Sequence, residues 1–259
     1  MDGETEDPRS RTFVTAFARG LDVILAFGPG ASRLTLSEVA LRAGVDRAVA
    51  RRALLTLVEL GYARSEGKHF SLTPKVLRLG QAFLGGEDMA RQLRPALDAL
   101  AQRIGQNASL TVLDYPDILH IARAEPPASA FRFALKTSER MPATATASGR
   151  VLMAGLPESE VLALLQRAPL PRFTARSVTS LAAMMAALRQ CRAQGFAVLD
   201  GELEEGFVSA AVPLLDQGGR LRAAVATSSH STRLDADRLA QEIVPLMREA
   251  AREMGSAIF

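Results

Sequence analysis

The stretch GVDRAVARRALLTLVELGYARSEGKHFSLTPKVLRLG, from Gly44 to Gly80, decides the fold of the first third of this chain. Asp46 has a side chain suited to capping a helix, and apolar residues then recur every three or four positions. This spacing predicts a helix from about Arg47 to Leu60, with arginines and small residues in its first turns. Such a helix suits the major groove of DNA, because small side chains permit close approach and arginines reach bases or phosphates.

A short hairpin is expected directly after this helix. Tyr62–Arg64 and His69–Leu72 can pair as strands, and Gly67 is suited to the turn between them. A basic hairpin in this position is the wing of a winged helix-turn-helix.

Two further short helices are expected upstream. Apolar residues at three- and four-residue steps from Phe13 to Leu25 form one helix face. Thr35 and Glu38 have the spacing of a capping box, at the start of a second helix that ends near Gly44. Three helices, with a glycine turn before the last, predict a helix-turn-helix arrangement.

The candidate DNA contacts lie on the third helix, on the wing and before the first helix. Side chains there can reach base edges, phosphates or the minor groove. The expected contacts are Arg9, Arg11, Thr35, Arg47, Ala48, Arg51, Arg52, Lys68 and His69. Two alternatives stay open: each arginine can be a solvated surface charge, and a winged helix can bind a protein instead of DNA.

The net charge of +3 is unevenly distributed along the chain. Residues 1–80 contain 12 Lys+Arg and 9 Asp+Glu, whereas residues 81–259 contain 19 of each. Residues 8–80 contain all 12 of those basic residues and only 5 acidic ones. A cationic small domain beside a neutral larger one indicates a polyanion as the partner of the first.

Composition limits the class of protein. The 259 residues are enough for two domains, and the 48% hydrophobic content is that of a globular protein. No apolar run reaches the roughly 18 residues of a membrane span, and the acidic N-terminus is unlike a secretory signal. A single cysteine, Cys191, favours a reducing cytoplasm. The three histidines lie far apart, so neither a metal site nor a cofactor is expected.

The rest of the chain has the pattern of a sheet covered by helices. Residues 74–87 predict a connecting helix, because Thr73 can cap it and Pro74 suits its first position. In the helix that follows, Pro95 requires either a kink or a later start. Strands are expected around Pro116-Asp117, at Ala130–Leu135 and at 196–199, 209–215 and 221–229. Helices are expected at 145–156, 157–166, 179–194 and 234–255, which gives an α+β sensor architecture.

Three stretches closely resemble the IclR family of transcription regulators. They are RRALLTLVELGYARSEGKHFSLTPKVLRLG (Arg51–Gly80), RMPATATASGRVLMAGLP (Arg140–Pro157) and GFAVLDGELEEGFVSAAVPLLDQGGRLRAAVATSS (Gly195–Ser229). The resemblance is greatest to the PcaR/PcaU/PobR branch, which controls the catabolism of protocatechuate and hydroxybenzoates. It implies a dimer, or a dimer of dimers, on a palindromic operator, and a GAF-like domain that senses a small organic or aromatic acid.

On this basis we expect a ligand-responsive DNA-binding regulator. The expected domains are a flexible N-terminal arm over 1–12, a winged helix-turn-helix over 13–73, a linker helix over 74–87 and a GAF-like effector-binding domain over 88–259.

The effector is expected where small polar side chains stand on strands and where a helix begins. The free N–H groups and the positive dipole end of that helix suit a carboxylate. The resemblance implies the same places, and the expected contacts are Thr146, Ser148, Gly149, Leu199, Phe207, Ser209, Ala226 and Ser228. Leu199 and Ala226 are apolar where a relative that senses a small acid has polar groups. That change suits an aromatic ring, on which Phe207 can stack.

A carboxylate also needs a cation, and Arg132 or Arg150 can supply it. Alternatively, Arg150 pairs with Glu202 or Glu205, the small hydroxyl residues are structural, and the acidic loop that contains both glutamates is a solvated surface. Rival classes are an enzyme that carries a winged-helix module and a winged-helix protein with no DNA role. The sequence has no glycine-rich phosphate loop, Gly-x-Ser-x-Gly elbow or His-Glu-x-x-His motif that would favour an enzyme.

Overall fold

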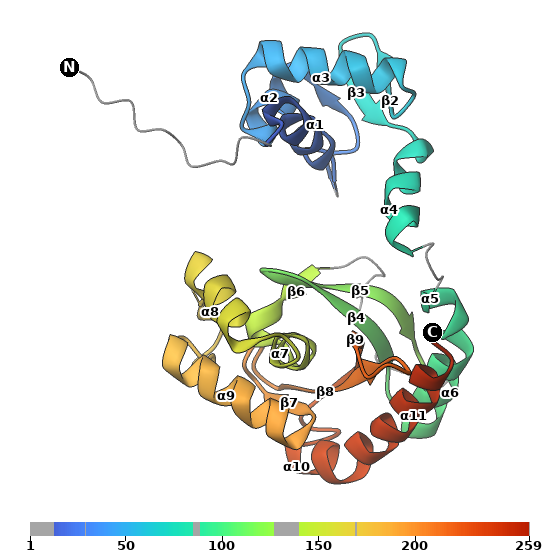
Figure 1. Cartoon of the computed structure of the whole chain (residues 1–259), viewed down its shortest axis with the longest axis vertical. Helices are drawn as coiled ribbons and strands as arrows, with labels where there is room; N and C mark the ends of the chain where they lie inside the picture. The colour runs from blue at the N-terminus through green and yellow to red at the C-terminus, as the bar shows by residue number, and fades with distance from the viewer. Residues whose placement is uncertain (1–12, 29, 85–88, 127–139, 169, 259) are drawn as a thin grey trace, which may run out of the picture. The chain divides into compact units, whose positions relative to one another are not determined.

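The chain divides into two compact units, Met1–Glu87 and Asp88–Phe259 (Figure 1). The computed structural model describes residues 13–28, 30–84, 89–126, 140–168 and 170–258. None of the helices in these ranges is long and apolar enough to cross a membrane.

The N-terminal unit is a winged helix, as the sequence predicts. A three-stranded antiparallel sheet with the order β1-β3-β2 packs with three helices. The elements are α1 (Thr15–Leu25), β1 (Leu34–Thr35), α2 (Leu36–Ala43), α3 (Arg47–Glu59), β2 (Ala63–Glu66) and β3 (His69–Leu72). The two-residue strand β1 was not expected, because it is too short to show a period in the sequence.

Local hydrogen bonds fix the ends of α2 and α3. The expected capping box is present: the Thr35 N–H donates to the Glu38 carboxylate at 2.7 Å, and the Thr35 hydroxyl accepts from the Glu38 N–H. Gly44, with φ of 64°, ends α2 in the left-handed region, which a side chain disfavours. The Asp46 carboxylate then accepts from the Val49 N–H at 2.8 Å and caps α3.

The wing is a tighter hairpin than the sequence suggested. Glu66 pairs with His69, so Gly67-Lys68 is a two-residue turn. We expected Ser65 and Glu66 in the turn, but both belong to β2. Gly67 has φ of 62°, and two-residue hairpin turns favour a glycine with a positive φ.

A small apolar core joins the helices of this unit to the wing. It contains one side of each helix and the first residue of β2, and its buried members are Val23, Ala26, Ala31, Leu34, Val39, Ala40, Ala50, Leu54, Leu57 and Ala63. The chain then continues as a 3-10 turn, Pro74–Val76, capped by Thr73, and as α4 (Leu77–Leu84).

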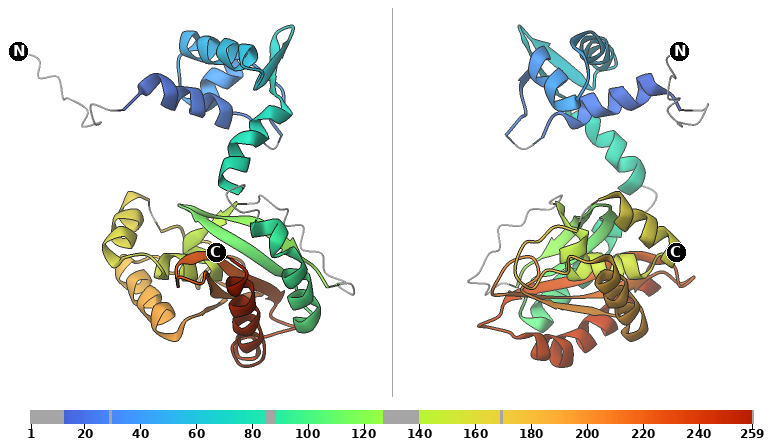
Figure 2. Two further views of the ribbon diagram at one scale, coloured as in Figure 1. Left: turned by 45° about the vertical axis from the view of Figure 1, so that its right-hand side comes forward. Right: turned by 90° about the vertical axis from the view of Figure 1, so that its left-hand side faces the viewer.

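The C-terminal unit is built on a curled, six-stranded antiparallel sheet (Figures 1 and 2). The strand order is β6-β5-β4-β9-β8-β7. The strands are β4 (Ala108–Asp114), β5 (Asp117–Ala124), β6 (Arg140–Pro142), β7 (Ala197–Asp200), β8 (Phe207–Leu215) and β9 (Leu221–His230). The short edge strand β6 was not expected, and the strand expected at 130–135 lies outside the described residues.

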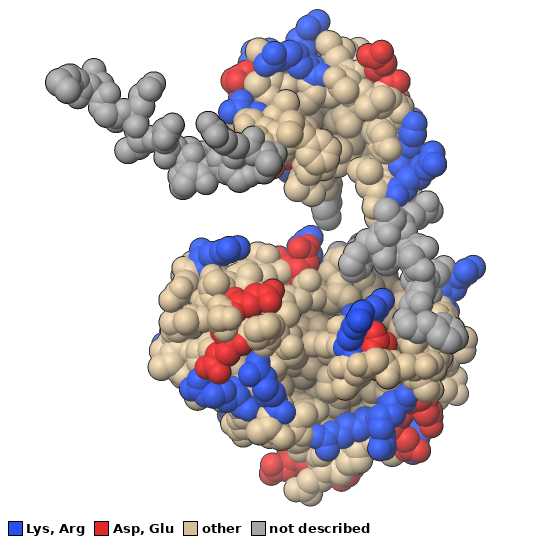
Figure 3. Space-filling view, viewed as in Figure 1, with Lys and Arg blue, Asp and Glu red and all other residues tan. Residues whose placement is uncertain are grey.

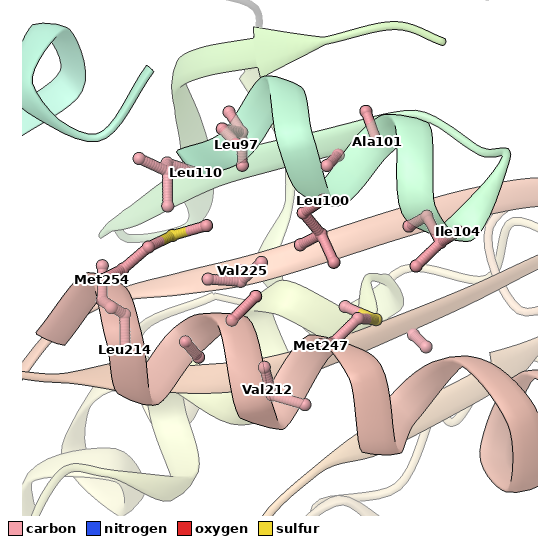
Figure 4. Close-up of a cluster of buried hydrophobic side chains, with 14 of the residues drawn as sticks. Leu97, Leu100, Ala101, Ile104, Leu110, Val212, Leu214, Val225, Met247 and Met254 are labelled. Carbon is pink, nitrogen blue, oxygen red and sulfur yellow. The ribbon is translucent and has the colours of Figure 1, made fainter. Parts of the chain in front are cut away.

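Helices cover both faces of this sheet. On one face, α6 (Arg94–Ile104) and α11 (Val244–Ser256) enclose the larger core, part of which is drawn in Figure 4. On the other face lie α7 (Ala147–Ala154), α8 (Glu158–Arg167) and α9 (Leu181–Gln194), with a second core. The ten residues labelled in Figure 4 are Leu97, Leu100, Ala101, Ile104, Leu110, Val212, Leu214, Val225, Met247 and Met254.

Two prolines interrupt helices of this unit. The segment around Pro95 forms two separate helices, α5 (Met89–Gln92) and α6, and α6 begins at Arg94, directly before the proline. This agrees with the later start that was one of the two expected alternatives. The closing helix expected over 234–255 is present from Ala236 to Ser256, but it is not a regular α-helix throughout. It consists of α10 (Ala236–Arg238), a π-helical segment Leu239–Ile243, and α11. Pro245 has no N–H for the helical hydrogen bond, which accounts for the irregular turns before it.

Candidate functional site

Helix α3 presents a basic surface to solvent. Its apolar side, Ala50, Leu54 and Leu57, is buried in the core. The remaining surface carries the four α3 residues that the sequence singled out, and Figure 3 shows basic side chains gathered over this helix. Those four residues, Arg47, Ala48, Arg51 and Arg52, are all exposed.

The charge of this surface is largely free of internal partners. Among the described residues, neither Arg47 nor Arg51 has a carboxylate within 4.0 Å. Two arginines of the three-stranded sheet region differ, because Arg33, just before β1, and Arg64 of the wing both pair with Glu66, at 3.6 and 3.4 Å. The first turns of α3 therefore keep the uncompensated positive charge that attracts phosphates.

The other expected DNA contacts have more varied surroundings. Lys68 is exposed in the turn of the wing, whereas His69 is half-buried in β3 and pairs with Thr35 of β1. The Thr35 hydroxyl is hydrogen-bonded to the Glu38 carboxylate at 2.8 Å, so its evident task is capping α2. Arg9 and Arg11 lie outside the described residues.

The second candidate site is a cavity at one end of the six-stranded sheet, on the face that α7 covers. Ser209 of β8 stands between Leu199 of β7 and Ser228 of β9, because each pair is in register. Phe207 lies two residues before Ser209 on β8, and its ring meets the His230 ring edge-on, with 5.2 Å between the two ring centroids. The lining therefore combines apolar surface with several hydroxyl groups.

Most of the expected effector contacts meet in this cavity. Gly149 and Arg150 are not part of the lining, and Arg132 lies outside the described residues. The expected residues that do line the cavity are Thr146, Ser148, Leu199, Phe207, Ser209, Ala226 and Ser228.

Gly149 has a structural role that its place beside the cavity did not suggest. A Cβ atom at this position would lie 1.9 Å from the carbonyl oxygen of Ala143. The close approach seats α7 against the 3-10 turn Ala143–Ala145. The Thr146 hydroxyl caps the same helix by accepting from the Gly149 N–H at 3.2 Å, and it donates to the Pro142 carbonyl at 3.1 Å.

Arg150 forms a buried ion pair, which was the alternative left open. Its Nη2 donates to Glu202 Oε2 at 2.6 Å, its Nε donates to the Thr144 carbonyl at 3.2 Å, and its side chain is 5% exposed. Burial raises the pKa of Glu202, and the Arg150 cation opposes that rise. The positive charge of Arg150 is thus already matched. The expectation that the whole acidic loop is a solvated surface is wrong for Glu202, whose side chain is 15% exposed.

The sequence reasoning missed the lining that β4 and β5 supply. These strands have the alternating pattern of ordinary half-buried strands, which by itself does not indicate a ligand site. The available signal was a set of polar residues at inward positions of an otherwise apolar hairpin. The missed polar lining residues of this part of the sheet are Asn107, Ser109, His120 and Arg123.

Within the ranges described, no three or more His, Cys, Asp or Glu side chains gather as they would to hold a metal ion. The winged helix has a basic helix with few internal partners, and the second unit has a cavity beside its sheet. Together these features define the class of two-domain, ligand-responsive, DNA-binding transcription regulators.

Comparison with known proteins identifies the family. Residues 16–67 match the IclR helix-turn-helix domain, and residues 81–256 match the bacterial transcriptional regulator IclR C-terminal domain. The chain belongs to the IclR family of transcriptional regulators.

Relatives match over almost the whole chain. The Pca regulon regulatory protein of Pseudomonas putida is 37% identical over 98% of this chain and 87% of its own length. The p-hydroxybenzoate hydroxylase transcriptional activator of Acinetobacter baylyi is 28% identical, over 98% of this chain and 95% of its own.

Crystal structures of relatives have the same fold. A structure assigned as a transcriptional regulator from Rhodococcus sp. RHA1 is 38% identical, with a TM-score of 0.74, over 94% of this chain and 97% of that chain. An IclR homologue from Microbacterium hydrocarbonoxydans, crystallised with 4-hydroxybenzoate, is 24% identical, with a TM-score of 0.72, over 93% of this chain and 98% of that chain.

Proposed function

We propose that this protein controls genes for the catabolism of aromatic acids of the protocatechuate or hydroxybenzoate type. A small organic acid in the C-terminal cavity is the signal. The observation that carries the proposal is the exposed, uncompensated basic surface of α3 on an IclR-type winged helix. The names of its Pseudomonas and Acinetobacter relatives support the choice of pathway. The protein acts as a regulator and not as an enzyme, in the cytoplasm, where its operator lies.

The DNA partner is a palindromic operator bound by a dimer or by a dimer of dimers. The winged-helix domain of each subunit inserts the first turns of α3 into the major groove. There, Arg47, Arg51 and Arg52 contact bases or phosphates, and Ala48 permits close approach. Lys68 and His69 of the wing contact the DNA backbone. Arg9 and Arg11 extend this surface as an arm, and Thr35 contributes at the start of α2.

The effector occupies the cavity of the C-terminal unit. Leu199, Ala226 and Phe207 provide apolar surface for a ring, and Ser209 and Ser228 provide hydrogen bonds. Thr146 and Ser148 complete the proposed contacts within the lining. Gly149 and Arg150 support this region from outside the lining, and Arg132 stays a proposed contact outside the described residues. The linker at 74–87 transmits effector binding to the DNA-binding domains, since a shift of this segment changes the spacing of the two winged-helix domains of a dimer.

The proposal predicts that Arg51→Ala weakens operator binding and leaves effector binding unchanged. The reason is that Arg51 is exposed on α3, away from the core of its unit. Loss of one base or phosphate contact costs about 1–3 kcal/mol, or roughly 10- to 100-fold in affinity. The measurement is fluorescence anisotropy with duplexes from upstream of aromatic-catabolism genes in the source genome.

Arg94→Ala is the matched control, because Arg94 is an exposed arginine of α6 that pairs with Asp98 in the other unit. It should bind the operator normally. If Arg51→Ala binds the operator as tightly as the unchanged protein, the assignment of α3 is wrong. If the unchanged protein binds none of the duplexes at low ionic strength, with or without aromatic acids, the proposed function fails.

A further inference from the structure

One buried cation in the effector cavity lacks a full set of partners. Arg123 lies near the end of β5 and is only 9% exposed, and it contributes to the lining. Its Nε donates to Glu125 Oε1 at 2.7 Å. Its Nη2 is buried and has no hydrogen-bond partner among the described residues. Arg123, a residue of the cavity lining, therefore has one positively charged donor without an acceptor.

The register of the sheet shows where this side chain points. Arg123 of β5 pairs with Ser109 of β4, and Ser109 pairs with Ala226 of β9. Directly opposite residues in a sheet share a face, so these three side chains form one row. Ala226 packs in the core beneath α7, which identifies the face as that of the cavity. Arg123 thus stands on the cavity side, beside the row that contains Ser209 and Ser228.

Free energy also argues for a missing partner. A buried donor with no hydrogen bond destabilises the folded state, and a charged donor does so more strongly than a neutral one. Glu125 satisfies the Nε and fixes the direction of the guanidinium, and its own side chain is 32% exposed. The Nη2 end lacks an acceptor among the described residues. A ligand carboxylate would supply that second acceptor.

The charges of the other lining residues point to the same group. Glu202 is already paired with Arg150, and Glu204 is exposed. No second arginine or lysine lines the described part of the cavity. Arg150, which sequence reasoning favoured as the effector's cation, has its charge matched by Glu202 and does not reach the lining. An acid that enters the cavity therefore meets one guanidinium, that of Arg123, which pairs with Glu125 through its Nε and has no hydrogen-bond acceptor for its Nη2 among the described residues.

We propose that Arg123 binds the carboxylate of the effector through its Nη2 end. The body of the acid then lies over Ser109 and Ala226, toward Leu199 and Phe207. This inference rests on the proposed function and makes it specific. The cavity selects acids over neutral molecules of the same shape, because a carboxylate gives the Nη2 donor a charge-assisted hydrogen bond that a neutral group gives more weakly.

The first test uses the unchanged full-length protein. Titration calorimetry compares 4-hydroxybenzoate and protocatechuate with 4-hydroxybenzamide, which has the same ring and hydroxyl but no charge. We expect the acids to bind at least roughly 10-fold more tightly than the amide, as the loss of a charge-assisted hydrogen bond requires. Equal affinity for acid and amide would overturn the inference and leave an aromatic effector in place.

The second test changes the arginine. Arg123→Gln should weaken 4-hydroxybenzoate binding by roughly 10- to 100-fold. Arg123→Lys should bind with intermediate affinity, because a lysine keeps the charge and loses the planar fork. Arg94→Gln, at an exposed arginine paired with Asp98, should bind normally. Operator binding without effector shows that each variant is folded.

The outcomes separate the inference from the proposed function. Normal acid binding by Arg123→Gln overturns the inference alone. If Arg123→Gln does not fold, Arg123→Lys and the comparison of acid with amide decide the result. If the unchanged protein binds neither acid, both the inference and the proposed class of effector fail, whereas operator binding by α3 is judged separately by Arg51→Ala.

Discussion

At the scale of single residues, Gly149 is the described glycine at which an added Cβ would come closest to another atom. An added Cβ would meet the Ala143 carbonyl oxygen at 1.9 Å, and a backbone atom cannot move aside as a flexible side chain does. We expect Gly149→Ala to lower the free energy of unfolding by about 1–3 kcal/mol through overpacking. Urea denaturation measures the change. Gly20→Ala is the control, because its Cβ would meet no atom within 4 Å and alanine favours the surrounding helix α1.

A second residue-scale prediction concerns Cys191 of α9. Burial raises the pKa of its thiol to about 11, and Arg150 and Arg192 oppose that rise. The native thiol therefore stays protonated at pH 8, where iodoacetamide should react with it far more slowly than in the unfolded chain. The native state holds its proton more tightly than the unfolded state does. The protonated thiol therefore adds to the free energy of unfolding below pH 9, and this addition is lost as the pH rises toward 11. Rapid alkylation of the native protein at pH 8 would contradict this account.

At the scale of elements, strands β8 and β9 bring distant segments of the chain to one cavity. Ser209 and Ser228 are directly opposite each other, so a larger side chain at either position fills the same space. We expect Ser228→Leu to abolish the effect of 4-hydroxybenzoate on operator binding while operator affinity without effector stays unchanged. Anisotropy titrations with and without the acid measure this.

The exposed residue Arg222 of the same strand provides the control for that substitution. Its side chain is 40% exposed, at the opposite end of β9 from Ser228, and it does not line the cavity. Arg222→Leu should therefore respond normally to the acid. If Ser228→Leu has normal effector affinity by calorimetry, the cavity is not the effector site.

At the scale of the whole molecule, charge is divided between the two units. The excess of basic residues lies before residue 80, and the remainder of the chain has equal numbers of basic and acidic residues. We expect the logarithm of operator affinity to fall linearly with the logarithm of salt concentration, by about 0.9 for each phosphate neutralised. Affinity of the cavity for 4-hydroxybenzoate should depend much less on salt, because a buried pair is weakly screened. A flat salt response of operator binding would contradict DNA recognition by the basic head.

Coupling between the two activities also belongs to this scale. An effector that favours one arrangement of the molecule shifts operator affinity by its difference in affinity for the two arrangements, typically about 1–3 kcal/mol. The reciprocal shift, of effector affinity by operator DNA, must have the same size.

The sequence by itself determined the elements whose causes are local. The capping box at Thr35, the cap at Asp46 and the glycines that end α2 and turn the wing each act within a few residues, so their chemistry can be read along the chain. The spacing of apolar residues predicted a winged helix, and the distribution of charged residues predicted a neutral second domain. Both domains are present.

Only the tertiary structure decided which side chains meet in the cavity. The pairing of Arg123 with Ser109, and of Ser109 with Ala226, joins residues up to 117 positions apart, and no local pattern encodes such a register. The partner of Arg150 and the contact that requires Gly149 likewise depend on how α7 packs. Sequence patterns report what one segment prefers, whereas a binding site depends on which segments the fold places face to face.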